Sequence, residues 1–207
     1  KILTQQFTTF KKTNMNPLLL TDGYKVDHRR QYPEETTLVY SNWTPRKSRI
    51  ENVDEVVFFG LQYFIKKYII EDFESSFFRQ PKEEVVKKYA RRINNYLGEN
   101  QVGTKHIEDL HDLGYIPMVF KALPEGASVP VRVPMFTMYN TKPEFFWLTN
   151  YFETLLSAVI WLPCNSATIA RQYRKVLDRF AKETSSVPEF VNWQAHDFSM
   201  RGMGGVE

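Results

Sequence analysis

Apolar residues recur at helical spacing through much of the first half of the chain. Between residues 61 and 69 they lie three, four, seven and eight positions apart, as on one face of a helix: Leu61, Phe64, Ile65, Tyr68 and Ile69. A second helix has Pro81 in its first turn and Gly98 as its C-cap, and a short one near 105–113 is closed by Gly114. A shorter helix near the start of the chain ends before Pro33.

The apolar period changes to two in two stretches. Residues 36–43 are β-prone, and residues 118–139 predict two or three strands with a turn at Pro124–Gly126. Valines and prolines alternate from Val129 to Pro134, which favours an edge or bulged strand because proline cannot donate to a sheet.

Strongly apolar helices are predicted towards the end of the chain. Thr141 and Glu144 fit a capping box, so a helix is expected over 142–160, with Pro163 separating it from another over 166–183. The apolar residues of the second helix are expected to face inward: Ile169, Tyr173, Val176, Leu177 and Phe180.

The chain closes on a predicted strand around Phe190 to Ala195, followed by a glycine-bearing loop. This order is typical of the opening of a βα unit. Helices joined by a β-rich stretch predict an α+β fold, preceded by a tail over residues 1–14.

Composition narrows the possible functions. The 207 residues are 43% apolar and 25% charged, which is typical of a globular protein. No run of about 18 apolar residues predicts a membrane span, and a net charge of +3 is too small to favour nucleic-acid binding. The single cysteine, Cys164, cannot form an internal disulfide and is expected to be a small core residue.

The glycine-bearing loop at 196–205 carries the most chemically suggestive residues. Backbone amides of such a loop can bind an anion, Arg201 adds a positive charge, and Phe198 can stack on a flat heterocycle. From spacing alone, a core phenylalanine and a solvated arginine remain the commoner interpretations.

Two further segments suit ligand binding. Asp22 and Tyr24 flank Gly23 and could present an acceptor and an aromatic platform, although a helix cap with a half-buried tyrosine explains them equally well. Arg46 and Lys47 lie in a basic loop that is either solvated or phosphate-binding. His106 and His111 are five residues apart and off a shared helical face, so no metal site is predicted.

Read together, five motifs carry a specific resemblance. They are LLLTDGYKVDHRRQYP, VYSNWTPRK, FFGLQYFIKKY, PEFFWLTNYFETLL and HDFSMRG. In this order and spacing they resemble the N-terminal part of the nicotinamide phosphoribosyltransferase family, over about residues 16–207. The resemblance implies a type II phosphoribosyltransferase. Residues 15–187 would form its N-terminal α+β domain, and residues 188–207 the first strand and loop of an incomplete α/β barrel.

The resemblance also implies a reaction and a set of binding residues. Nicotinamide and 5-phosphoribosyl 1-pyrophosphate, with Mg²⁺ on the diphosphate, would give nicotinamide mononucleotide in a cytoplasmic homodimer with shared active sites. Phe198 and Tyr24 match rings that stack on the two faces of nicotinamide, Tyr24 coming from the partner subunit. Asp22 lies beside the Tyr24 ring, and Arg201 matches an arginine near nicotinamide and the phosphates. Arg46 and Lys47 match basic residues that reach the diphosphate across the subunit interface.

Three expectations complete this interpretation. The catalytic residues are expected beyond Glu207, so the chain by itself is expected to be inactive. Related nicotinate enzymes usually carry a second arginine after the position of Arg201, where this chain has Gly202, which favours an amide substrate. The alternatives are a nicotinate phosphoribosyltransferase and a non-catalytic dimerisation module. Neither nucleic acid nor membrane is expected as a partner.

Overall fold

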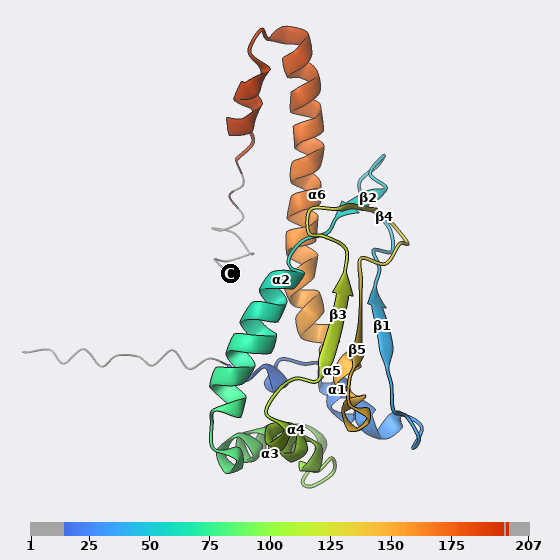
Figure 1. Ribbon diagram of the computed structural model, residues 1–207, viewed down its shortest axis with the longest axis vertical. Helices are drawn as coiled ribbons and strands as arrows, with labels where there is room; N and C mark the ends of the chain where they lie inside the picture. The colour runs from blue at the N-terminus through green and yellow to red at the C-terminus, as the bar shows by residue number, and fades with distance from the viewer. Residues whose placement is uncertain (1–14, 197, 199–207) are drawn as a thin grey trace, which may run out of the picture. The chain divides into compact units, whose positions relative to one another are not determined.

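The computed structural model describes residues 15–196 and residue 198 (Figure 1). These residues fall into two compact units. The smaller unit comprises residues 15–20 and Lys67–Ile116. The larger unit comprises Thr21–Lys66 and the chain from Pro117 onward.

The smaller unit is helical. A π-helical stretch, Ile65–Asp72, leads into it from the boundary, a second follows at Glu74–Phe78, and a 3₁₀ turn spans Pro17–Leu19. Helices α3 (Lys82–Leu97) and α4 (Lys105–Leu113) end at Gly98 and Gly114, as predicted. The core consists of fully buried side chains: Leu18, Phe73, Phe77, Tyr89, Ile107 and Leu110.

The helix predicted over 61–69 is present, but only its first turn is α-helical. Helix α2 (Leu61–Phe64) begins after Gly60 and continues as the π-helical stretch. Gly60 has a φ of +105°, and a Cβ there would lie 3.1 Å from the ring of Pro163. A glycine is therefore required, both for the backbone conformation and for the close approach of the two segments.

A three-stranded antiparallel sheet organises the larger unit. Its order is β1 (Tyr40–Trp43), β5 (Phe136–Asn140) and β3 (Met118–Ala122), with β5 in the middle (Figure 1). Alternate residues of β5 are buried, which confirms the period of two. Trp43 opposes Phe136 in the register, and their rings stack with centroids 5.8 Å apart.

A second, two-stranded sheet pairs β2 (Glu55–Val57) with β4 (Ser128–Pro130). Strand β4 pairs with β2 alone among the described residues and ends at Pro130, in agreement with the predicted edge strand. Strand β2 was not predicted, because three residues beside a polar loop carry too little pattern.

Helix α6 corrects the prediction of two helices on either side of Pro163. It is one continuous helix, Glu153–Thr184, that contains Pro163, whereas two helices separated by that proline were predicted. Proline lacks the amide proton that would donate one helical hydrogen bond, but its φ is compatible with a helix. Contacts of α6 with neighbouring segments compensate for the lost bond. The Cys164 sulfur donates to the carbonyl of Phe59, and Thr168 accepts a hydrogen bond from the Val57 amide.

The capping box predicted at Thr141 is also wrong. The chain enters this region through a 3₁₀ turn, Pro143–Phe145, whose cap position is Lys142 without a side-chain cap. The short helix α5 (Leu148–Tyr151) follows and leads into α6. The amide of Thr141 is instead taken by the carbonyl of Pro117, which ties this segment to the start of β3.

The apolar face of the second half of α6 is exposed, contrary to the prediction. Ile169, Tyr173, Val176 and Phe180 are 42–60% exposed. The buried positions lie mostly in the first half, which contacts β2 and α2, whereas near its end α6 contacts the 3₁₀ segment Pro188–Trp193. Periodicity identified the stripe correctly but could not indicate whether another element covers it.

The strand predicted around Phe190 to Ala195 is replaced by this 3₁₀ helix, Pro188–Trp193. Pro188 sets a helical φ in the first turn, and only Val191 is buried, so no alternating face forms. The described residues therefore show a mixed helix and sheet fold, as predicted, but not the start of a barrel.

Within the described part of the chain, no single helix is long and apolar enough to cross a membrane. One bent pair, Pro143–Tyr151 with Glu153–Thr184, meets the length and hydropathy criteria jointly, with a 44° bend between its parts.

Thr168→Val should destabilise the protein by about 1–3 kcal/mol, because the buried amide of Val57 loses the hydrogen-bond acceptor that the Thr168 hydroxyl provides. Urea denaturation measures this change. Thr184→Val is the matched control on the same helix. The Thr184 hydroxyl donates to the Phe180 carbonyl at an exposed site, so the change should stay within about 0.5 kcal/mol. Equal effects of the two variants would contradict the role of Thr168.

Candidate binding site

Helix α1 (Gly23–His28) presents Tyr24 as an exposed ring. The side chain is 54% exposed, and its ring packs edge-on against His28 with centroids 5.0 Å apart. The next residue, Lys25, is buried and places its ammonium 5.1 Å from the centroid of the Tyr24 ring. A 3₁₀ turn, Arg29–Gln31, continues α1 up to Pro33, as predicted. Tyr24 is therefore supported on one side and open on another, which suits stacking.

Asp22 lies at the N-cap position of α1, but its side chain does not cap the helix. Its carboxylate instead accepts a hydrogen bond from the hydroxyl of Thr154 at 2.7 Å, and its amide donates to the same hydroxyl at 3.1 Å. Asp22 thus occupies the predicted cap position, but its side chain does not make the hydrogen bond of a helix cap.

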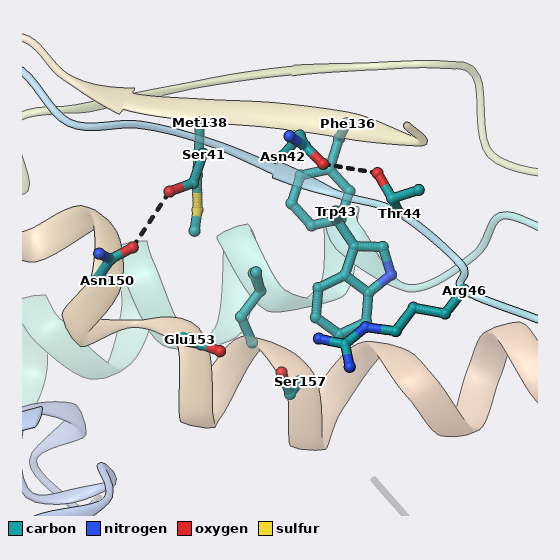
Figure 2. Close-up of a pocket in the computed structure, with 11 residues that line it drawn as sticks. Ser41, Asn42, Trp43, Thr44, Arg46, Phe136, Met138, Asn150, Glu153 and Ser157 are labelled. Atoms are coloured by element: carbon teal, nitrogen blue, oxygen red, sulfur yellow. Dashed lines mark hydrogen bonds between the residues drawn. The ribbon is translucent and has the colours of Figure 1, made fainter. Parts of the chain in front are cut away.

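Arg46 borders a pocket of about 410 Å³ between β1, β5 and the first two turns of α6 (Figure 2). The lining includes Ser41, Trp43, Phe136, Asn150, Glu153 and Ser157. The Arg46 side chain makes no hydrogen bond or ion pair with any residue that the structure describes. Figure 2 shows its guanidinium pointing towards the helix that carries Glu153 and Ser157. A positive charge thus stands at the mouth of a partly polar pocket, where an anion can approach it.

Packing fixes the walls of this pocket. The stacked rings of Trp43 and Phe136 form one side. On another side the Ser41 hydroxyl donates to the side-chain carbonyl of Asn150 at 3.2 Å, and the Asn150 amide donates to the Tyr32 hydroxyl. The spacing of residues in the sequence did not indicate these pocket residues. Each occupies an ordinary position in a strand or helix, and only the packing of the sheet against the helices brings them together.

The remaining predicted site residues are only partly placed. Lys47 is exposed next to Arg46, and Phe198 is 67% exposed. Arg201 lies outside the described residues. Among the described residues Tyr24 and Arg46 do not touch. Glu153 links their surroundings, because it lines the Arg46 pocket and forms an ion pair with Lys25.

His106, His111 and Cys164 have structural roles. His106 is buried with its Nε2 3.4 Å from the Tyr89 hydroxyl, and His111 lies 2.9 Å from the carbonyl of Gln80. Cys164 is buried, as predicted, and burial raises the pKa of its thiol. No group of three or more potential metal-ligating side chains gathers among the residues placed by the structure.

Comparison with known proteins identifies the chain's relatives. Residues 16–117 match the sequence model described as nicotinamide phosphoribosyltransferase, N-terminal domain. This segment includes the Tyr24 platform and the loop of Arg46. The chain belongs to the nicotinamide phosphoribosyltransferase family.

Individual relatives of this family extend the match beyond residue 117. The chain is 53% identical over 197 residues to nicotinamide phosphoribosyltransferase of Acinetobacter baylyi, covering 93% of this chain and 39% of that protein. It is 33% identical to the Mycoplasma pneumoniae nicotinamide phosphoribosyltransferase, covering 94% of this chain and 46% of that protein. The chain thus spans less than half the length of these curated relatives.

A solved structure supports the fold alone. The crystal structure of human nicotinic acid phosphoribosyltransferase aligns with a TM-score of 0.55 at 18% sequence identity. The alignment covers 77% of this chain and 28% of that one.

Arg46→Ala should leave the free energy of unfolding within about 0.5 kcal/mol of the wild-type value, because the exposed guanidinium supports no other side chain among the described residues. Thermal or urea unfolding measures this. Phe136→Ala is the contrasting variant: its buried ring forms the pocket wall, and its removal should cost about 3–5 kcal/mol. A large loss in Arg46→Ala would assign that arginine to the fold rather than to a ligand.

Proposed function

We propose that this chain is part of an enzyme that forms nicotinamide mononucleotide and diphosphate from nicotinamide and 5-phosphoribosyl 1-pyrophosphate. The observation that carries the proposal is the family membership, together with the name shared by its curated relatives. The exposed Tyr24 ring and the Arg46 pocket support it, since they offer one surface for a flat heterocycle and another for an anion.

The reaction sets clear physical requirements. The ring nitrogen of nicotinamide forms a bond to C1 of the ribose while the bond from C1 to the diphosphate oxygen breaks, and the electron pair leaves with the diphosphate. The nitrogen is a weak nucleophile, so the enzyme must hold the ring in line with C1. The negative charge that develops on the leaving diphosphate must be stabilised by positive groups that are already in place.

The residues divide between these two requirements. Tyr24 and Phe198 would stack on opposite faces of nicotinamide, with Asp22 beside the ring. Arg46 and Lys47 would contact the diphosphate, and Arg201 would lie near both nicotinamide and the phosphates. The exposure of Tyr24, Phe198 and Arg46 leaves their side chains accessible for these roles.

Other parts of the proposal concern the setting of the reaction. We expect Mg²⁺ to arrive on the diphosphate of the substrate, where its charge would help to neutralise the leaving group. A homodimer would let Tyr24 of one subunit face nicotinamide bound by the other. A cytoplasmic location would suit a small phosphorylated substrate.

The protein encoded by the complete reading frame containing this chain should form nicotinamide mononucleotide from nicotinamide far faster than nicotinate mononucleotide from nicotinate. Chromatographic separation of the two products measures the ratio. A preference for nicotinate would favour the nicotinate enzyme instead. No product from either substrate would favour a non-catalytic dimerisation module.

The 207-residue chain expressed by itself should show no turnover, because it spans 39% of the Acinetobacter baylyi relative and carries only part of the expected site. The same chromatographic assay tests this, with the complete protein as positive control. Nicotinamide mononucleotide formed by the isolated chain would contradict the expectation.

A further inference from the structure

Contacts between three pairs of residues hold the start of α1 against the junction between α5 and α6. The Thr21 hydroxyl donates to the carbonyl of Tyr151 at 3.1 Å. Asp22 bonds twice to Thr154, and Lys25 pairs with Glu153. The partners are about 130 residues apart in sequence, so these contacts set the place of α1 in the larger unit.

The Thr154 hydroxyl both accepts and donates in its contact with Asp22. It accepts the Asp22 amide proton and donates its own proton to the Oδ2 atom of the carboxylate. A hydroxyl can do both at once, whereas a methyl group of the same size can do neither. The Oδ1 atom accepts no hydrogen bond from the described part of the chain. One oxygen of the Asp22 carboxylate therefore keeps its capacity to accept a hydrogen bond.

The Lys25–Glu153 pair extends this fastening to the Arg46 pocket. The Lys25 side chain is 5% exposed and lies beside the Tyr24 ring, whereas Glu153 is 55% exposed and lines the pocket. Two neighbouring residues on the first turn of α6 thus act on different parts of the site. Thr154 holds Asp22. Glu153 holds Lys25, which lies beside the Tyr24 ring, and also lines the pocket where Arg46 would meet an anion.

We propose that Thr154 and Glu153 are positioning residues that fix the Asp22 carboxylate and the Tyr24 ring relative to the Arg46 pocket. This inference rests on the proposed function. Neither residue needs to touch a substrate: Thr154 acts through Asp22, and Glu153 acts through Lys25. An error of about 1 Å in the placement of a reacting ring is enough to cost a large factor in rate.

The test compares Thr154→Val with Thr154→Ser in the complete protein. Thr154→Val should lower kcat/KM for nicotinamide about 10- to 100-fold, with the KM for 5-phosphoribosyl 1-pyrophosphate close to wild type because Arg46 is untouched. Thr154→Ser, which keeps the hydroxyl, should restore most of the activity. Thr184→Val, at the far end of α6, is the matched control and should leave both constants unchanged.

A second pair of variants tests Glu153. Glu153→Gln and Lys25→Met should each lower kcat. The kcat of the double variant should be no lower than that of the less active single variant, because both substitutions remove the same ion pair. Asp178→Asn, which breaks an exposed ion pair with Arg174 on the same helix, is the control and should have no effect. Additive losses in the double variant would overturn the role of Glu153.

The outcomes separate the two proposals. The positioning role alone is refuted if the wild type is active and Thr154→Val is unimpaired. It is also refuted if Thr154→Ser is as inactive as Thr154→Val. A wild type that forms no nicotinamide mononucleotide refutes the proposed function, and with it this inference.

Discussion

The first half of α6 is buried against the strands and helices of the larger unit, and much of that unit depends on this packing. Leu156 and Ile160 are almost fully buried on its inner face. Polar side chains on the same half reach the elements around it: Thr154 reaches α1, and Thr168 reaches β2. Burial of the apolar face provides the stabilisation, and the hydrogen bonds determine where each neighbouring element sits.

This arrangement explains how a site can be assembled from segments distant in sequence. Asp22 and Tyr24 come from α1, Arg46 from the loop after β1, and Glu153 from α6. Glu153 touches both neighbourhoods, since it pairs with Lys25 and lines the Arg46 pocket. In the proposed reaction the flat ring and the diphosphate belong to different substrates, so their binding surfaces must be held at a fixed distance. One rigid helix is a direct way to hold them.

The second half of α6 contrasts with the first. Tyr173 and Val176 carry the same helical periodicity as the buried residues upstream, yet 50–60% of each is exposed. The stripe is a property of the sequence, whereas its burial depends on another surface. The 3₁₀ segment Pro188–Trp193 contacts α6 but leaves these residues exposed.

The sequence by itself determined the local structure wherever the pattern was strong: α3 and α4 with their terminal glycines, and the strands of 118–139 with their edge proline. Its motifs also identified the family, and Cys164 as a core residue. Only the tertiary structure decided that α6 runs through Pro163, that Phe190 to Ala195 do not form a strand, and that the Asp22 carboxylate bonds to Thr154 rather than capping its helix. The reason is physical. Periodicity and propensity act over a few residues, whereas a partner about 130 positions away decides whether a proline is tolerated, a strand is paired or a carboxylate is engaged.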